Sequence, residues 1–210
     1  LVFSSTASVY GIPQYIPMNE DHPTEPINYY GETKLQIERN LKWFSELKGI
    51  RFATLRYFNA AGYDVKGRIR GKEKNPQNLI PIVMEVASGI QKKMEVFGND
   101  YDTHDGTGVR DYIHVNDLAT AHVKSMEHIS STYENVLINL ATGEGHSVLD
   151  VINKAKEVTG NEILFEIVGR RDGDPATVVA GSNKANEILD WMPQYSDLDT
   201  LIRSAWEVYK

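Results

Sequence analysis

Tyr30 and Lys34 are the residues of this sequence whose types and spacing point most directly to chemistry. They lie four positions apart in a segment that predicts a helix ending near Leu47, and this spacing places both side chains on one face. An ammonium group beside a phenol favours the ionised phenolate, which is a usable general base near neutral pH. Such pairs also occur by chance in helices, so the meaning of this one depends on the elements around it.

Two segments that predict parallel strands flank this helix, and both end in polar residues. Leu1 to Ser5 predicts a buried strand that leads into Thr6, and Arg51 to Phe58 predicts a second strand that leads into Asn59. The carboxyl ends of parallel strands meet at one edge of an open α/β sheet, where such folds bind ligands. We therefore expect these strand ends and the Tyr/Lys helix to converge there.

The rest of the chain alternates between strand and helix patterns. Asn28 and Ser147 are expected helix caps, Asn59 to Gly62 predicts a sharp turn, and residues 63–77 predict a mobile loop over a site. Further expected strands are residues 94–97, 111–115, 136–140, 163–168 and 177–180, and further expected helices are residues 79–90, 116–128, 148–158, 183–190 and 197–209. This alternation predicts an α/β fold with parallel pairing.

Composition excludes several classes of function. The 210-residue chain has a formal net charge of -7, which argues against a nucleic-acid-binding protein. It has no cysteine, which excludes disulfides and thiolate metal sites and fits a cytoplasmic location. The six histidines show no ligand spacing, so we predict no metal. No apolar run approaches the roughly 18 residues of a membrane span, and the given sequence shows no signal-peptide pattern, so we expect no membrane association.

Several motifs resemble one enzyme family. SSTASVYG, YYGETK and LRYFNAAG follow one another in the order and spacing of extended short-chain dehydrogenases/reductases. NLIP at 78–81, FGNDY at 97–101, DGTGVRDYIHV at 105–115, NLATG at 139–143 and RRDGDP at 170–175 resemble the UDP-glucose 4-epimerases of that family. The resemblance implies the C-terminal part of a Rossmann-type parallel sheet plus a smaller α/β substrate-binding domain. Residues 1–62 and about 113–141 would form the former, and about 63–112 and 142–210 the latter.

The resemblance also implies an activity, the interconversion of UDP-glucose and UDP-galactose through a 4-keto sugar with tightly bound NAD. Tyr30 would be the catalytic base, Lys34 would hold the nicotinamide ribose, and Thr6 would hydrogen-bond the sugar 4-hydroxyl. The implied cofactor-binding residues are Tyr30, Lys34, Tyr57 and Ser4. The implied substrate-binding residues are Thr6, Phe58, Asn59, Asn78, Leu79, Phe97, Arg110, Arg171, Asp174 and Val178.

Within that set, the resemblance gives Arg110 and Arg171 to the diphosphate, Asp174 to a ribose hydroxyl and Phe97 to the uracil. Guanidinium groups suit the first task because they bind phosphate through two parallel hydrogen bonds. Val178 falls where the family has its sugar-pocket gate. A small residue there implies that UDP-N-acetylhexosamines are also accepted.

Other residues have structural interpretations. By itself, the dipeptide Arg170-Arg171 is typical of a solvated surface pair. Only the Gly173-Asp174 that follows favours Arg171 as a ligand-binding residue. Asp111, Tyr112 and His114 are expected to be buried and hydrogen-bonded. Glu20 and Asp21 are expected on a loop surface.

The glycine-rich NAD fingerprint of the family is not found in this sequence. The resemblance places it before Leu1, so we expect a fragment that does not bind NAD tightly by itself. The resemblance implies that the longer protein forms homodimers through the helix that carries Tyr30 and Lys34 and the helix before it, which would lie upstream of Leu1. Two alternatives stay open. One is another extended family member, a dehydratase or decarboxylase, although Ala7-Ser8 stands where dehydratases have an Asp-Glu pair. The other is a nucleotide-sugar-binding fragment without turnover.

Overall fold

The strands that carry the polar ends pair side by side, as the sequence predicts. In the computed structural model, which describes residues 1–210, β1 (Val2–Thr6), β2 (Ala53–Tyr57) and β7 (Val136–Leu140) form a parallel sheet in the order β1-β2-β7. Thr6 lies opposite Tyr57, and Tyr57 lies opposite Leu140. The carboxyl ends of all three strands therefore coincide at one edge.

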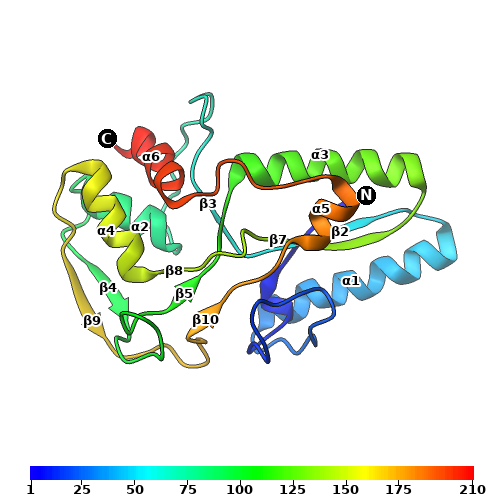
Figure 1. Cartoon of the computed structure of the whole chain (residues 1–210), viewed down its shortest axis with the longest axis horizontal. Coiled ribbons are helices and arrows are strands. Elements are labelled where there is room, and N and C mark those ends of the chain that lie inside the picture. The colour runs from blue at the N-terminus through cyan, green and yellow to red at the C-terminus, as the bar shows by residue number, and fades with distance from the viewer.

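Two long helices cover this sheet from opposite sides, α1 (Tyr29–Lys48) and α3 (Val115–Thr132) (Figure 1). The short helix α5 (Asn183–Leu189) joins α3 on its side of β7. The predicted domain division places residues 142–210, which include α5, in the substrate-binding domain. In the structure, α5 packs on the core of the sheet β1-β2-β7 instead. The apolar core of this part includes Ala53, Leu55, Ile113, Ala121, Ile138, Leu140, Ala185 and Trp191.

A second group of elements packs around its own, larger apolar core. Helices α2 (Leu79–Ala87), α4 (Val148–Thr159) and α6 (Leu198–Tyr209) gather at the other end of the molecule, beside the parallel pair β4 (Met94–Phe97) and β9 (Phe165–Val168) (Figure 1). The buried centre includes Ile80, Val83, Met84, Val96, Ile152, Leu201 and Ile202. None of the helices has the length and apolarity needed to cross a membrane.

Short strands lie between the two cores. β3 (Asn59–Ala61) pairs in parallel with β6 (Tyr112–His114), and β10 (Thr177–Val178) pairs in parallel with β5 (Val109–Arg110). β5 also pairs with β8 (His146–Ser147), and this pair is antiparallel, which the sequence did not predict. The predicted sharp turn at residues 59–62 is wrong in part. The first three residues belong to β3, and only Gly62 has the left-handed backbone of a turn, with φ +75°.

Two burial predictions also need correction. The predicted buried strand at the N-terminus is only partly buried, because β1 is an edge strand of this sheet and Leu1 is 59% exposed. In α1, Leu41 is buried, whereas the apolar side chains of Phe44 and Leu47 are 52% and 72% exposed. The apolar pattern of α1 is therefore wider than the face that packs on this chain.

Candidate active site

The start of α1 is fixed so that Tyr30 lies beside the turn after β1. The Gly31 main-chain N–H donates to the Asn28 side-chain oxygen over 2.8 Å, which confirms the predicted cap. Gly31 also packs against the short helix η1 (Ala7–Val9), because a Cβ at this position would lie 2.4 Å from the Ser8 carbonyl oxygen. Only glycine permits this approach, and it brings Tyr30 close to the segment that begins at Thr6.

Lys34 lies on the same face of α1 as Tyr30, as their spacing predicts. Its Nζ is 5.7 Å from the centre of the Tyr30 ring and donates to the Ser4 carbonyl oxygen over 2.9 Å. One of its three N–H groups is used by this bond, which leaves two for a ligand. The Tyr30 side chain is half exposed, so its hydroxyl is open to a ligand as well.

The polar side chains at the end of β1 have partners within the protein. The buried Thr6 hydroxyl accepts from the Ser8 main-chain N–H over 3.2 Å and donates to the Ser8 hydroxyl over 3.3 Å. Ser4 Oγ is 2.9 Å from His122 Nε2, and His122 Nδ1 is 2.7 Å from the Leu118 carbonyl oxygen. A carbonyl only accepts, so Nδ1 carries the proton and Ser4 donates. The Ser4 hydroxyl therefore faces α3, while its carbonyl faces Lys34.

A cavity of about 620 Å³ opens next to Asn59, two residues beyond the end of β2. It collects predicted substrate-binding residues from β3, α2, β4, β5 and the segment before β10: Asn59, Asn78, Leu79, Phe97, Arg110, Arg171 and Asp174. The other predicted site residues do not line it: Ser4, Thr6, Tyr30, Lys34, Tyr57, Phe58 and Val178. Val178 is nevertheless adjacent, because it pairs in register with Arg110, and Val178 and Phe58 pack against the same small apolar cluster.

The charged side chains of the cavity are already ordered by contacts within the protein. Arg110 forms an ion pair with the Asp174 carboxylate and donates to the Val109 carbonyl oxygen over 2.7 Å. The Arg171 guanidinium stacks on Phe97, with 3.7 Å between its Cζ and the ring centre. Two guanidinium groups therefore border one cavity, which is an arrangement suited to a phosphate-bearing ligand.

The polar lining has two kinds of amide. Asn59 Nδ2 donates to the Asp111 carbonyl oxygen over 2.8 Å, so this side chain supports the pairing of β3 with β6. Asn78 occupies the N-cap position of α2 but makes no side-chain capping bond, which leaves its amide free. The N-terminus of α2 therefore faces the cavity at Asn78 and Leu79, and helix N-termini favour anions.

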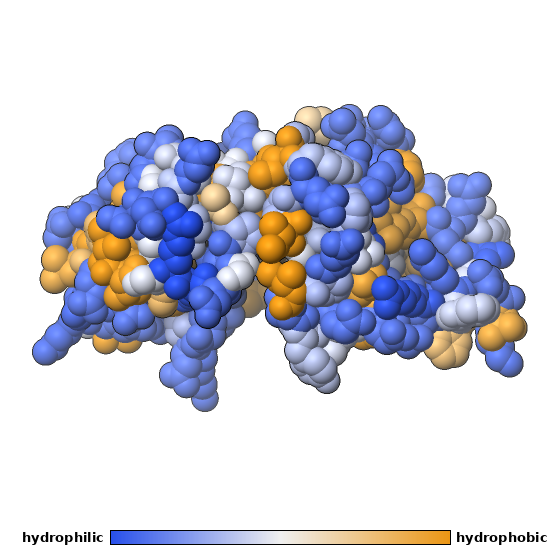
Figure 2. Space-filling model, turned by 90° about the horizontal axis from the view of Figure 1, so that it is seen from below, coloured by the Kyte–Doolittle hydropathy of each residue, from blue (hydrophilic) through white to orange (hydrophobic).

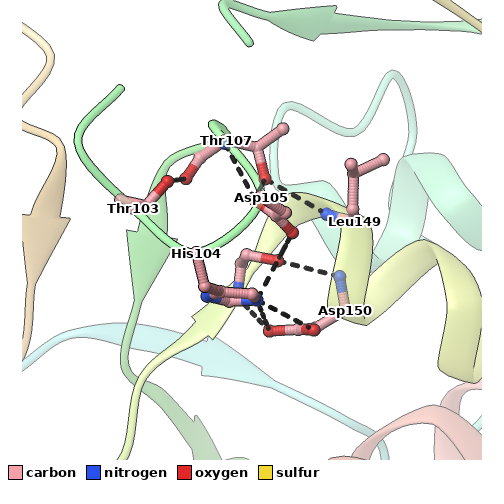
Figure 3. A network of polar contacts seen from close by, with 7 residues as sticks. Thr103, His104, Asp105, Thr107, Leu149 and Asp150 are labelled. Atoms are coloured by element: carbon pink, nitrogen blue, oxygen red, sulfur yellow. Dashed lines mark hydrogen bonds and ion pairs between the residues drawn. The ribbon is translucent and has the colours of Figure 1, made fainter. Parts of the chain in front are cut away.

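A polar network that the sequence reading missed holds the loop before Arg110 (Figure 3). Asp105 accepts from the Thr107 N–H over 2.8 Å and the Thr107 hydroxyl over 2.7 Å, and it also accepts from the Ser147 hydroxyl. Burial alone would raise the pKa of Asp105, but these hydrogen bonds lower it below its usual value. The Asp-Gly-Thr motif at 105–107 is a local signal that could have indicated this turn.

The same network fixes the start of α4. Ser147 Oγ accepts from the Asp150 N–H, and Asp150 Oδ2 accepts from the Ser147 N–H, each over 2.9 Å, which is a capping box. His104 Nε2 lies 3.3 Å from Asp150 Oδ2 and 3.5 Å from Asp105 Oδ2 (Figure 3). Such a trio is of a type that can hold a metal ion, but its carboxylate oxygens are engaged as acceptors for the loop and the helix. Its visible role is to order the segment that leads to Arg110.

The residues predicted to be structural are buried. Asp111 accepts from Thr142 and Gly143, and burial raises the pKa of its carboxyl to about 6 in spite of these bonds. His114 Nδ1 accepts from the Asn116 N–H over 3.0 Å, and burial lowers the pKa of His114. Tyr112 is buried too and borders the cavity.

Two buried contacts differ from the sequence reading or were missed by it. Glu20, expected on a loop surface, accepts from the Asn139 N–H over 2.7 Å, because its loop folds over the carboxyl end of β7. Arg56 and Glu38 form a bidentate ion pair with only about 5% of either side chain exposed, and Ser5 donates to Glu38. This pair connects α1 to β2 one helical turn beyond Lys34, on the same face of α1.

Known proteins resemble this chain in sequence and in shape. The family described as GDP-mannose 4,6 dehydratase matches residues 1–205. The chain is 49% identical over 211 residues to a UDP-glucose 4-epimerase of Halalkalibacterium halodurans, covering 100% of the chain and 63% of that protein. It is 46% identical over 207 residues to one of Streptococcus mutans, covering 98% of the chain and 62% of that protein. The chain therefore spans less than two thirds of the length of these relatives.

Solved structures agree with the sequence comparison. A UDP-glucose 4-epimerase from Brucella ovis in complex with NAD superposes with a TM-score of 0.96 at 41% identity, covering 99% of this chain and 64% of the other. A UDP-Glc/GlcNAc 4-epimerase from Campylobacter jejuni superposes with a TM-score of 0.82 at 37% identity, covering 99% and 63%. With its Tyr-x-x-x-Lys helix and its parallel sheet, the chain belongs to the extended short-chain dehydrogenase/reductase family described as GDP-mannose 4,6 dehydratase.

Proposed function

We propose that this chain supplies the proton-transfer residues and the substrate pocket of an NAD-dependent 4-epimerase that interconverts UDP-glucose and UDP-galactose. The observation that carries the proposal is the pairing of two features: a Tyr30 and Lys34 face joined to β1 by the Lys34 bond to Ser4, and a cavity bordered by Arg110 and Arg171. The names of the similar proteins support it, since they are UDP-glucose 4-epimerases.

The cavity would hold the UDP part of the substrate. Its volume of about 620 Å³ lies within the roughly 300–1,000 Å³ of small-molecule pockets. Arg110 and Arg171 would bind the diphosphate, with Asn59, Asn78 and Leu79 beside it. Phe97 would stack on the uracil. Asp174 would accept from a ribose hydroxyl, and its present ion pair with Arg110 keeps both side chains ordered before the ligand arrives.

The proton chemistry would belong to three side chains. Tyr30 would take the proton of the sugar 4-hydroxyl and later return it to the same oxygen. Lys34 would favour the ionised phenol, because its ammonium lies close to that ring. Thr6 would hydrogen-bond the 4-hydroxyl and help to move its proton. The Ser8 contacts of Thr6 set the direction of that hydroxyl before the sugar binds.

The residues at the sheet edge fit the nicotinamide end of NAD. Lys34 has two unused N–H groups for ribose hydroxyls, and Tyr57 stands at the end of β2 opposite Thr6. Ser4 would contribute its main chain, since its hydroxyl is bonded to His122. When bound, NAD supplies reversible acceptance of the C4 hydride, with no net redox change. We propose that this chain alone holds NAD weakly, since the sequence lacks the glycine-rich turn that binds the pyrophosphate.

Two alternatives remain. A dehydratase or decarboxylase of the same family would use the same pocket, and the matching family carries a dehydratase description. Dehydratases need an acid and a base beside the triad hydroxyl, whereas Thr6 is followed by Ala7 and Ser8, which carry no carboxylate. The second alternative, a nucleotide-sugar-binding chain without turnover, is favoured only by the missing NAD fingerprint.

We further propose that Val178 permits activity on UDP-N-acetylhexosamines. It lies next to the cavity-lining Arg110, with which it pairs in register, and its small side chain would leave room for an N-acetyl group. The structural similarity to an epimerase for both UDP-Glc and UDP-GlcNAc supports this. A Val178→Tyr variant of the whole protein should lose conversion of UDP-N-acetylglucosamine and keep that of UDP-glucose. Equal losses on both sugars would contradict the proposal.

We propose a cytoplasmic homodimer that pairs through α1. The helix exposes Ile37, Trp43, Phe44 and Leu47, and apolar side chains lie among hydrophilic ones on the half of the molecule that contains α1 (Figure 2). Phe44→Asp should convert the dimer to a monomer in sedimentation measurements of the whole protein.

For the domains, we propose that the sheet β1-β2-β7 belongs to the cofactor-binding unit and the core around α2, α4 and α6 to the substrate-binding unit.

The deciding experiment measures conversion of UDP-galactose to UDP-glucose by this chain and by the longer protein made when upstream coding sequence is included. Conversion by the longer protein, with NAD bound, is the expected result. A longer protein that binds NAD but converts no UDP-hexose would overturn the proposed substrate. Activity of the 210-residue chain alone would overturn the proposal that it holds NAD weakly.

A further inference from the structure

Arg170 makes a set of contacts that the proposed roles of its neighbours do not explain. Its Nε donates to Asp100 Oδ1 over 2.6 Å, and its Nη2 donates to the main-chain carbonyl of the same residue. Its guanidinium also stacks on Tyr101, with 4.2 Å between Cζ and the ring centre. Arg170 itself does not line the cavity, so these contacts serve the protein and not a ligand directly.

These contacts lie just past the end of the β4-β9 pair, where strand pairing no longer holds the segments after β4 and β9 together. The β4-β9 ladder ends at Phe97 opposite Val168, with one further bond from the Gly98 N–H to the Val168 carbonyl oxygen over 2.9 Å. Beyond it, the segments 98–101 and 169–171 leave the sheet as loops. The Arg170 bonds to Asp100 therefore replace the ladder just past its end.

Gly98 shows how closely the two loops approach. A Cβ at this position would lie 2.8 Å from Arg170 Cγ and 2.8 Å from Tyr101 Cε2, and the backbone has φ +79°. Glycine meets both requirements, since it has no Cβ and adopts positive φ without strain. The hydrogen bond from Arg170 also holds the pKa of the Asp100 carboxyl below its usual range, so the ion pair persists at neutral pH.

Consecutive arginines thus act on the two sides of one loop. Arg170 holds Asp100 and Tyr101, and Arg171 stacks on Phe97 at the cavity. We propose that Arg170 is a positioning residue for the nucleotide end of the substrate, which fixes Phe97 and Arg171 at the spacing that UDP requires. This inference rests on the proposed function and goes beyond it, because it assigns a role to a residue outside the pocket.

The test compares variants of the whole protein in UDP binding, measured by calorimetry, and in KM and kcat. The ion pair is partly exposed, with 45% and 71% of the two side chains accessible, so the effect is expected to be moderate. Arg170→Ala should weaken UDP binding and raise KM by roughly 3–10-fold, with kcat within about twofold of wild type. Arg170→Lys should restore part of the loss, because it keeps the charge and loses the bidentate fork.

Two further variants make the interpretation specific. Asp100→Asn should weaken UDP binding in the same direction as Arg170→Ala but by less, because it removes the charge of the ion pair and leaves the main-chain bond and the Tyr101 stacking of Arg170. The double variant should bind no more weakly than Arg170→Ala, because that variant already removes every contact between the two residues. Asp100→Asn also keeps the test decisive if Arg170→Ala fails to fold. Arg203→Ala is the matched control, since Arg203 forms an exposed ion pair with Asp199 on α6.

The outcomes separate this inference from the proposed function. UDP binding in Arg170→Ala and Asp100→Asn that equals that of Arg203→Ala would overturn the positioning role while leaving the proposed function intact. A change confined to kcat would overturn it too, since a residue that orders the nucleotide pocket acts on binding. A wild-type protein that binds no UDP would overturn the proposed function and this inference with it.

Discussion

The Lys34 ammonium donates a hydrogen bond to the main-chain carbonyl of Ser4, with 2.9 Å between Nζ and oxygen. Lys34 lies in the second turn of α1, and Ser4 lies in β1, two residues before Thr6. The bond therefore connects the helix directly to this strand. The Ser4 side chain is bonded to His122 on the other side of the sheet. The register of the proposed proton-transfer residues is therefore set from both faces of the sheet.

Replacing the Tyr30 hydroxyl should remove turnover and keep binding. In the whole protein, Tyr30→Phe should lower kcat on UDP-galactose by roughly 10²–10⁴-fold, because the general base is lost. UDP binding should stay nearly unchanged, since Tyr30 does not line the cavity. Tyr29→Phe is the matched control, as this neighbouring ring is 85% exposed. Unchanged turnover in Tyr30→Phe would refute the assigned base.

A side chain at Gly31 should disturb the site through the backbone. Gly31→Ala would place a Cβ 2.4 Å from the Ser8 carbonyl oxygen, so α1 and η1 must move apart. We expect a loss of about 1–3 kcal/mol in the free energy of unfolding, together with a lower kcat. Gly71→Ala is the control, because its Cβ would meet nothing within 4 Å. Equal denaturation midpoints for the two variants would contradict this packing.

Removing one partner of the buried Arg56–Glu38 ion pair should lower the stability of the fold more than removing both. Arg56→Met leaves the Glu38 carboxylate buried without its charge partner and should lower the free energy of unfolding by about 3–5 kcal/mol. The double variant Arg56→Met with Glu38→Met should recover much of that loss, because no charge stays buried. Chemical denaturation of the three proteins measures both effects. A double variant less stable than the single one would show that the pair itself stabilises the fold.

Asp111 should make stability depend on pH with a definite sign. Burial raises its pKa from 3.8 to about 6, so the folded state binds the proton more tightly than the unfolded chain. Its stabilising contribution is complete below about pH 4 and is lost as the pH rises through 6. Relative to Asp111→Asn, the free energy of unfolding of wild type should fall by about 2 kcal/mol between pH 4 and pH 7.

That experiment also has a clear opposite outcome. The carboxylate accepts hydrogen bonds from Thr142 and Gly143, and such bonds favour the charged form. Should they outweigh burial, wild type would gain stability relative to Asp111→Asn over the same range. Denaturant midpoints at several pH values distinguish the two signs.

Local features of the site could be predicted from the sequence because they depend on residues a few positions apart. The spacing of Tyr30 and Lys34 fixes a common helix face, and Asn28 and Ser147 cap their helices as expected. The strands at 94–97 and 136–140 have the predicted bounds. Seven of the substrate-binding residues that the resemblance implies, from Asn59 to Asp174, line one cavity.

Contacts between distant segments were decided by the tertiary structure alone. The ion pairs of Arg110 with Asp174 and of Arg170 with Asp100 join residues more than 60 positions apart, as does the Ser4 contact with His122. No local pattern encodes such partners, because they depend on which strands end side by side. The sequence by itself determined the helix face and its capping, whereas packing decided which side chains the pocket holds in place.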